Sequence, residues 1–485
     1  MERESAIMHY DRAKAIPGKS REKQQIAETR RPYNRWGKQM PLPLFDLSTN
    51  GNGNGQTAFR DPAFGENKNL PVHRWVPWIA GYSASFVDDV ISTYLGHQKA
   101  GALVIDPFCG VGTTLLQAVL HGHNAIGFEI NPYPALVARA KLNAPSIDLD
   151  EIDATLLSMR KASGNWQNGA LPAGIQPPPL KSRLPFFSPK VERQALHALE
   201  FVNHIEAESI SNLFRAAFGA VMVSFSNYTY EPSLGSRQAA GKRPIDDANV
   251  AQILLAKLYQ MRTDIAWIQG DTRGRNLGQG AVVHSDFFLG NDCIDPGTVN
   301  LIVTSPPYMN NYHYVRNTRP QLYWLNFVSS PAEQKYLETQ NFGPYWQNVR
   351  EAAPVALTFE FRDLEITLQK LRETRVDKGA YGGPGWANYV ASYFNDCFRF
   401  MAALKRLLAS GGVGVVVIGN SIIQGLDIRT EKILGEIGVM QGLTLDGIYC
   451  IREKRVGASI TRSSVRYGER NNAVLSEWAV VVKKE

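Results

Sequence analysis

The sequence has few of the features that mark secreted, disulfide-rich or membrane-spanning proteins. Its four cysteines are widely spaced and form no Cys-x-x-Cys pair: Cys109, Cys293, Cys397 and Cys450. This spacing excludes a dense disulfide framework and a zinc knuckle, and it fits a reducing compartment best. No apolar run approaches the ~18 to 20 residues of a membrane span, and the charged start from Met1 to Arg12 lacks the apolar stretch of a signal peptide. We therefore expect a soluble, unsecreted, cytoplasmic protein.

Neither sign of charge dominates, and no residue type is strongly over-represented. Lys and Arg number 52 against 45 Asp and Glu, which gives a net charge of +7. This excess permits an anionic partner without requiring one. The 44% hydrophobic and 20% charged residues exclude wholesale disorder, a collagen helix and a coiled coil. The nine histidines show no metal-ligand spacing, so we expect no metal site.

Seven short apolar runs, rich in Val and Ile, alternate with helical patterns. They are Ala102 to Asp106, Ala125 to Ile130, Ala281 to Ser285, Asn300 to Thr304, Val413 to Gly419, Leu445 to Ile451 and Trp478 to Lys484. This alternation predicts an α/β fold with a mostly parallel, Rossmann-like sheet covered by helices. A long polar segment, not a helix, joins the last two runs, so these are expected to pair antiparallel at one edge.

The length of 485 residues exceeds one ordinary domain of roughly 100 to 200 residues, so we divide the chain into four parts. They are a basic tail and Asn/Gly linker (1–69), a first core part (70–150), a mainly helical insertion (151–280), and a second core part (281–485) that carries its own insertion at 309–386. Helical spacing of apolar residues within the helical insertion predicts three helices. They are expected over Lys190 to Glu206, Glu208 to Asn227 and Asp246 to Trp267.

The first predicted strand leads into a glycine loop, and Ala102 to Thr114 reads ALVIDPFCGVGTT. Gly110 and Gly112 allow positive φ and a close backbone approach, and the N-terminus of the following helix offers unpaired N–H groups. The loop lacks both the third small residue of a dinucleotide fingerprint and the Gly-Lys-Ser/Thr of a phosphate loop. Glu129, at the end of the next strand, is placed to accept both ribose hydroxyls of an adenosine ligand. The pattern indicates a nucleoside without a pyrophosphate; the alternative is that the acidic residues only cap helices and the glycines only make a turn.

A second motif, Thr304-Ser-Pro-Pro-Tyr308, ends a later strand. Two consecutive prolines fix the backbone and remove two N–H donors, which leaves the Ser305 hydroxyl and the Pro306 carbonyl as acceptors. Acceptors of this kind suit an exocyclic amino group, whose lone pair is freed when its N–H groups donate hydrogen bonds. Tyr308 offers a face for stacking on a base swung out of its helix. The alternative is a proline-stiffened loop with a core tyrosine.

Together, DPFCGVGTT, Glu129 and TSPPY resemble the amino-methylating DNA methyltransferases that use S-adenosylmethionine, in particular the N4-cytosine group with an S-P-P-Y site. The resemblance implies a seven-stranded sheet with an antiparallel edge strand, S-adenosylmethionine as cofactor and DNA as partner. It also implies a prokaryotic setting with action at the nucleoid, and it leaves room for a restriction or defence-system partner. The cofactor motifs precede TSPPY here, which is the unpermuted order of the family, and the helical insertion between them is the candidate target-recognition region.

The resemblance assigns roles to individual residues. The segment His73 to Leu95 resembles the family's helix-leading motif, and Val283-His-Ser-Asp286 sits where the family places a residue beside the adenine ring. The implied cofactor-binding residues are Ser83, Phe86, Asp106, Phe108, Gly110, Gly112, Thr113, Glu129 and Asp286. The implied catalytic residues are Ser305, Pro306, Pro307 and Tyr308.

Two basic stretches are candidates for contact with nucleic acid. The polar residues 310–319 follow the catalytic motif directly, and Arg316 and Arg319 among them suit phosphates. The segment 452–470 joins the last two strands and offers Arg455 and Arg462 for gripping the backbone. The alternatives are a packed polar loop for the first stretch and a solvated loop for the second.

Three other functions are compatible with the same core. N6-adenine methylation differs only in the flipped base, although adenine enzymes more often carry an acidic residue or Asn at the position of Ser305. An RNA methyltransferase would share the glycine loop but usually carries Asp or Asn before the prolines. A non-catalytic DNA-binding partner would show a broken motif, and none is visible. Cytosine carbon-5 methylation is disfavoured because the chain has no Pro-Cys dipeptide.

Overall fold

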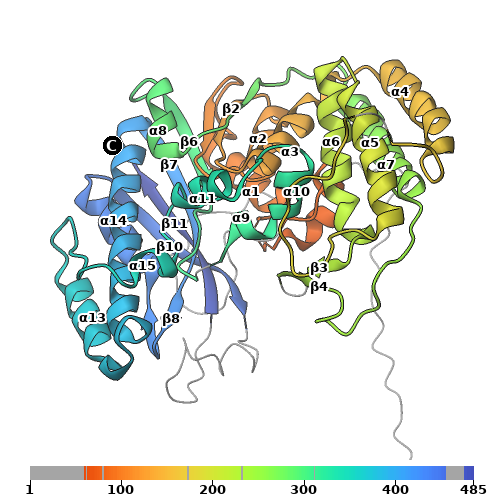
Figure 1. Cartoon of the computed structure of the whole chain (residues 1–485). Helices are drawn as coiled ribbons and strands as arrows, with labels where there is room; N and C mark the ends of the chain where they lie inside the picture. The colour runs from red at the N-terminus through yellow and green to blue at the C-terminus, as the bar shows by residue number, and fades with distance from the viewer. Residues whose placement is uncertain are drawn as a thin grey trace, which may run out of the picture. The chain divides into compact units, whose positions relative to one another are not determined.

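The seven predicted strands form one sheet in the order β10-β11-β7-β6-β1-β2-β5 (Figure 1). Their bounds are β1 Leu103–Asp106, β2 Asn124–Phe128, β5 Gly280–Val283, β6 Val299–Thr304, β7 Leu408–Gly419, β10 Thr444–Lys454 and β11 Leu475–Lys483. All neighbours from β7 to β5 run parallel, whereas β11 runs antiparallel to both β7 and β10. The antiparallel pair at one edge is therefore confirmed, and the strand that opposes the rest of the sheet is β11, second from that edge.

The structure is a computed structural model that describes residues 59–61, 63–78, 81–171, 174–230, 233–310, 312–454 and 475–485. Contacts divide the chain into the units Met1–Gly55 and Gln56–Glu485, and every described residue belongs to the second unit. That unit includes the sheet, both insertions and residues upstream of the predicted core start at residue 70. The functional division into four parts stays a prediction.

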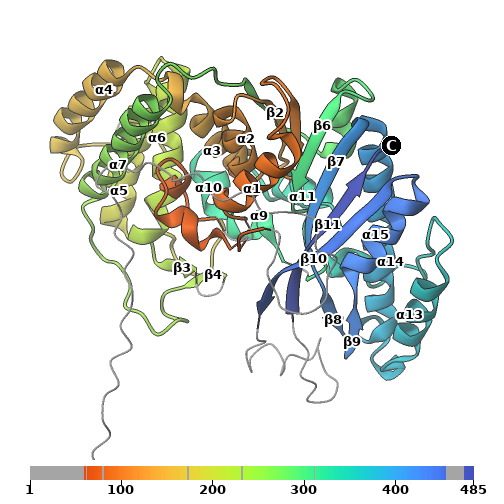
Figure 2. The ribbon, with the colours of Figure 1, turned by 180° about the vertical axis from the view of Figure 1, so that it is seen from behind.

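Helices cover both faces of the sheet (Figures 1 and 2). Alternate strand residues face opposite ways, so that Val104 packs with helices α1 and α2 while Ile105 packs with α14 and α15. These helices are α1 Ala84–Leu95, α2 Thr113–Leu120, α3 Pro132–Asn143, α14 Gly383–Leu407 and α15 Thr430–Met440. Burial on both faces explains why the central strands β1, β6 and β7 read as continuous apolar runs. Because β1, β2 and β6 run parallel, their carboxyl ends lie together at one end of the sheet.

The three predicted helices of the helical insertion are confirmed, and a fourth precedes them. The bounds are α4 Leu149–Ala162, α5 Pro189–Asn203, α6 Glu208–Val221 and α7 Val250–Asp271. Their apolar faces share one buried cluster with α3 and with helix α10 (Arg319–Trp324) of the second insertion. Gly219 on α6 lies against the Tyr133 ring of α3, where a Cβ would overlap that ring. The insertion is thus packed directly on the core.

Shorter elements complete the described chain. The helices are α8 Phe287–Gly290, α9 Tyr314–Asn317, α10 Arg319–Trp324, α11 Pro331–Thr339, α12 Trp346–Val349 and α13 Arg362–Glu373. The 3-10 turns are Phe64–Lys68, His73–Trp75, Ala144–Ser146, Ser163–Asn165, Met222–Phe225, Asn291–Cys293 and Val376–Tyr381. Two hairpins pair β3 Tyr228–Tyr230 with β4 Leu234–Ser236, and β8 Ser421–Ile423 with β9 Leu426–Ile428. Among the described helices, none has the length and apolar character needed to cross a membrane.

Candidate active site

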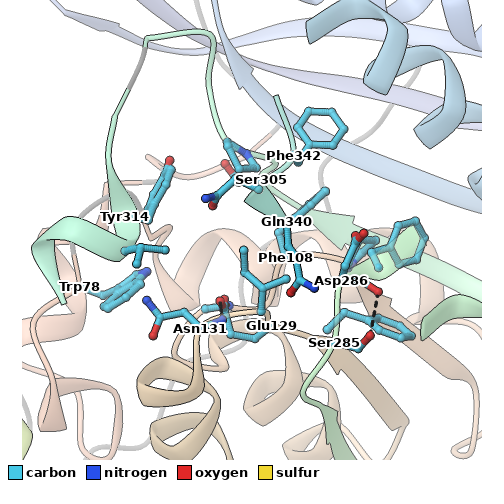
Figure 3. A pocket seen from close by; sticks show the side chains of 18 residues that line it. Trp78, Phe108, Glu129, Asn131, Ser285, Asp286, Ser305, Tyr314, Gln340 and Phe342 are labelled. Carbon is cyan, nitrogen blue, oxygen red and sulfur yellow. Dashed lines mark hydrogen bonds between the residues drawn. The ribbon is translucent and has the colours of Figure 1, made fainter. Parts of the chain in front are cut away.

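A pocket opens at the carboxyl ends of β1, β2, β5 and β6, where open α/β sheets bind their ligands (Figure 3). Each of these strands contributes residues that the sequence had singled out. The predicted residues in the lining are Phe108 and Gly110 after β1, Glu129 after β2, Asp286 after β5, and Ser305 and Pro307 after β6. The structure therefore brings the glycine loop, the acidic residue and the catalytic turn into one cavity.

Gly110 sits where the backbone of the glycine loop meets the pocket. Its φ of 49° lies in the left-handed region, and a Cβ there would stand 3.1 Å from Nε1 of Trp78. The Gly110 N–H donates to the Glu129 carboxylate at 3.1 Å. Any larger residue would strain the turn and push Trp78 away, so this position favours glycine both for its φ and for space.

Glu129 presents a carboxylate to the pocket. One oxygen accepts the Gly110 N–H, and the other accepts the Asn131 N–H at 2.8 Å. Burial raises the pKa of Glu129 to about 7, although the two backbone hydrogen bonds oppose the rise; the charge of Asp106 adds to it. The acid therefore changes protonation near neutral pH, and in its ionised form it can accept hydroxyl donors.

Asp106 lies beneath the pocket rather than in its lining. Its buried carboxylate accepts Tyr82 Oη at 2.7 Å, Thr114 Oγ1 at 2.7 Å, Thr304 Oγ1 at 2.6 Å and the Phe108 N–H at 3.0 Å. Burial raises the pKa of Asp106 against the effect of these four donors. Since the donors belong to β6, α2 and the segments before α1 and after β1, Asp106 fixes the strand ends around the site. The structure supports a positioning role for Asp106 rather than a direct cofactor contact.

Four other predicted cofactor residues also lie behind the pocket. Ser83 caps α1 by accepting the Phe86 N–H at 3.2 Å, and Phe86 is fully buried in the core. Gly112 supports the close approach of α2 to α3, because a Cβ there would stand 2.8 Å from the Cβ of Ala138. Thr113 is buried as the first residue of α2. None of the four is in the lining, so direct contact by these residues stays a prediction that this arrangement does not support.

The segment before α1 reaches the pocket through Trp78, which the sequence analysis missed. Asp264 on α7 holds this segment, since it accepts the Val72 N–H at 3.0 Å and Trp75 Nε1 at 3.1 Å and forms an ion pair with Arg74. Val72 has a φ of 64°, a conformation that costs energy for a β-branched residue. The helical insertion thus fixes one wall of the pocket, and the only sequence signal was the pair of tryptophans in WVPW.

In the catalytic turn, the predicted motif from Thr304 to Tyr308, some residues line the pocket and others pack into the core. Ser305 and Pro307 line the cavity, whereas Pro306 is buried and Tyr308 is not among the lining residues. The Tyr308 ring packs over Gly419, where a Cβ would stand 3.1 Å from it. Its hydroxyl bonds to Ser305, and burial raises the pKa of Tyr308 well above its usual value. Acceptance by the Pro306 carbonyl and stacking by Tyr308 stay predictions.

Other residues that line the pocket lie outside the two sequence motifs. Tyr314, which the sequence placed along a DNA path, contributes an aromatic ring to the pocket, and residues 340–342 cover it from the second insertion (Figure 3). The loop that follows is held by α14, because Gly343 donates its N–H to Asp396 at 3.0 Å. On the same helix, Tyr393 Oη donates to the Pro307 carbonyl at 2.9 Å. Helix α14 therefore anchors both the pocket cover and the catalytic turn.

Tyr393→Phe tests the anchoring of the catalytic turn. Loss of one neutral hydrogen bond costs about 1 kcal/mol, and we expect a roughly five- to tenfold lower kcat, since small displacements of a positioned group are costly. The affinity for S-adenosylmethionine should stay within about twofold, because the lost hydrogen bond is made to the Pro307 carbonyl and not to the glycine loop. Single-turnover kinetics and calorimetry measure the two quantities. An unchanged kcat would show that the turn needs no such anchor.

Of the four arginines predicted to contact nucleic acid, the structure describes two. Arg316 is exposed on α9, and Arg319 at the start of α10 donates to the carbonyl of Lys181. Arg455 and Arg462 lie outside the described residues. Within the described ranges, no group of three His, Cys, Asp or Glu side chains is placed to hold a metal ion.

The pocket suits a nucleoside cofactor. Phe108, Phe128 and Phe287 offer apolar rings, Glu129 offers a carboxylate, and Gly110 contributes backbone without a side chain. The strand order and the antiparallel β11 give the sheet the Rossmann-like arrangement of the methyltransferase fold, and the pocket lies at the carboxyl ends of its parallel strands.

Comparisons with known proteins narrow this class. Residues 86–138 match the family described as DNA methylase, N6_N4_Mtase. The chain is 25% identical over 276 residues to the Type II methyltransferase M.BsoBI of Geobacillus stearothermophilus, an alignment that spans 53% of each chain. It is 22% identical over 419 residues to M.AvaI of Nostoc sp., covering 80% of this chain and 82% of that one. A shorter match, 37% over 79 residues, is to M.MjaII of Methanocaldococcus jannaschii and covers 16% and 14% of the two chains.

These matches show that this chain is similar to a DNA methylase family and to Type II methyltransferases, in agreement with the motif resemblance. They imply S-adenosylmethionine as the methyl donor. The match to the first relative spans about half the length of that protein, and the matches do not distinguish N4-cytosine from N6-adenine.

Proposed function

We propose that this protein transfers a methyl group from S-adenosylmethionine to the N4 amino group of cytosine in DNA. One observation carries the proposal: Ser305 of the S-P-P-Y turn lines the same pocket as Glu129 and Gly110. A group that binds a nucleoside and a group that accepts hydrogen bonds from an amine thus face one cavity. A restriction or defence-system partner acting on the same DNA sequence is part of this proposal.

The residues of the chain divide the work between cofactor and base. Glu129 accepts the ribose hydroxyls, Gly110 presents its backbone to the cofactor without a side chain, and Asp286 accepts a hydrogen bond from the adenine amino group. The bound S-adenosylmethionine supplies an electrophilic methyl group on its sulfonium. Ser305 accepts a hydrogen bond from the target amine and so directs the lone pair of its nitrogen into the cavity.

Two aromatic residues near the turn are available for the flipped base. Tyr314 already lines the pocket, and Tyr308 lies directly after the prolines. Stacking on an aromatic ring stabilises an extruded base by about 1 to 3 kcal/mol. The tyrosines therefore offset part of the cost of opening the duplex.

N6-adenine methylation is the second candidate, because the same acceptors suit either amine. The serine at position 305 favours cytosine, since the S-P-P-Y form of the motif resembles the N4-cytosine group. The choice rests on this one position, so the target base is the part of the proposal to test.

Labelled S-adenosylmethionine, incubated with the protein and either unmethylated genomic DNA or total RNA, tests substrate and base together. The nucleic acid is digested to nucleosides and separated by mass spectrometry. We expect label in N4-methylcytosine from DNA only. Label in N6-methyladenine would overturn the base, and label in RNA alone would overturn the substrate.

A further inference from the structure

The β3–β4 hairpin of the helical insertion lies against the helix that follows the catalytic turn (Figure 1). Tyr230 Oη donates to the Asn317 carbonyl at 2.9 Å, and the Leu234 N–H donates to the Asn317 side chain at 3.1 Å. Gln321 donates to Tyr230 Oη at 3.3 Å. Because Asn317 ends α9 and Tyr314 of the same helix lines the pocket, these bonds fix the hairpin beside the site.

A stretch before α5 joins the same surface. The Leu184 N–H donates to Tyr228 Oη at 3.2 Å, and the rings of Phe186 and Tyr228 stack with centroids 5.4 Å apart. Arg319, at the start of α10, donates to the carbonyl of Lys181. Residues 181–186, the hairpin and the helices after the catalytic turn therefore form one continuous surface.

The loop after β4 is held by its own hydrogen bonds. Arg237 donates its N–H to the Asn227 carbonyl at 2.8 Å and its Nε to the Arg243 carbonyl at 2.9 Å. The Ile245 N–H donates to the Asn227 side chain at 3.0 Å. The backbone of this loop is thus fixed while the side chain of Arg243 is exposed.

Positive charge gathers on this surface. Four exposed cations define what we call the hairpin cation patch: Lys181, Arg183, Arg243 and Arg316. No carboxylate in the described part of the chain forms an ion pair with any of the four. Asp246 and Asp247 follow the loop, and Asp247 forms an ion pair with Lys190 at 3.6 Å, outside the patch. The patch therefore keeps its charge, and exposed cations of this kind suit phosphate oxygens.

We propose that the hairpin cation patch contacts the phosphates of the DNA that flanks the target base. The part of the helical insertion that grips DNA is then the β3–β4 hairpin with its two neighbouring loops, rather than helices α4 to α7. This inference rests on the proposed function, because it takes DNA as the substrate of the adjacent pocket. Contact with phosphates releases counterions, so the affinity must fall as salt rises.

The test removes charge from the patch without touching the pocket. A triple variant, with Lys181, Arg183 and Arg243 each changed to Ala, is compared with a matched control. The control loses three exposed cations from the same insertion: Arg160→Ala, Lys161→Ala and Arg273→Ala. Fluorescence anisotropy measures binding to a random-sequence DNA duplex across a salt series, and calorimetry with S-adenosylmethionine checks the fold of each variant.

We expect the triple variant to bind DNA about tenfold more weakly or worse at roughly 0.1 M salt. The slope of log affinity against log salt should fall by about 2 to 3, one for each lost phosphate contact. The control should match the wild type. A second variant, Arg183→Lys with Arg243→Lys, keeps the charge and should keep the slope.

Several results would overturn the proposal. If the triple variant keeps the wild-type slope while the wild type methylates DNA, the patch does not grip DNA and the proposed function still stands. If the control variant loses as much DNA affinity as the triple variant, the loss comes from the overall charge of the protein and not from the patch. If the lysine variant loses the salt slope although it keeps the charge, the loss comes from a changed structure. If the wild type binds and methylates only RNA, the patch proposal and the proposed function fail together.

Discussion

Ser305→Ala is expected to lower kcat about 100-fold, which is the scale seen when one preorganised hydrogen-bonding group is removed from an active site. The Ser305 side chain lines the pocket and bonds to Tyr308, and its loss removes the acceptor that we propose for the target amine. The affinity for S-adenosylmethionine should stay within about threefold, because Glu129 and Gly110 keep their contacts. Methylation of DNA under single-turnover conditions and calorimetry with the cofactor give the two numbers.

A matched control comes from Ser224, an exposed serine whose hydroxyl bonds only to the Val221 carbonyl among the described residues. Ser224→Ala should leave both quantities unchanged. Equal losses of kcat and cofactor affinity in Ser305→Ala would contradict the assigned role, because they would place the residue in cofactor binding or in the fold.

Glu129→Gln is expected to weaken binding of S-adenosylmethionine about 10- to 100-fold. Hydrogen bonds to a charged acceptor are worth about 1.5 to 3 kcal/mol, whereas an amide accepts more weakly and cannot take two hydroxyl donors through ionised oxygens. The backbone bonds from Gly110 and Asn131 also lose a charged partner. Glu192→Gln on α5, a half-buried carboxyl outside the pocket, is the control and should bind as the wild type does.

The pH dependence of binding tests the same residue by a second route. The pKa of Glu129 in the free protein is raised to about 7, so the carboxyl is mostly protonated below that pH. Binding that requires the carboxylate must then release a proton, and affinity falls about tenfold between roughly pH 8 and pH 6. This loss should be absent in Glu129→Gln. A wild-type profile with the same shape as that of the variant would mean that Glu129 does not titrate with binding.

The sequence predicted the central strands β1, β6 and β7 well because they are largely buried and therefore read as apolar runs. The same logic brought Gly110, Glu129, Asp286 and Ser305 together, since the carboxyl ends of parallel strands meet. The sequence does not show in which direction each side chain of a motif points. Asp106 belongs to the motif, yet its carboxylate turns to donors beneath the pocket.

The missed lining residues depend on contacts between distant parts of the chain. Trp78 is placed by the bonds of Asp264 to the segment upstream, and residues 340–342 are placed by the bond between Gly343 and Asp396. No local pattern marks either arrangement, because the partners are about 190 and 53 residues apart. Such residues become visible only once the fold is known.

The most direct measurement is a crystal structure of the protein with S-adenosylmethionine and a DNA duplex that carries its target. The account predicts the ribose on the Glu129 carboxylate, the adenine beside Asp286, and a flipped cytosine whose amino group donates to Ser305. Cofactor bound elsewhere, or a target base that does not reach Ser305, would contradict it.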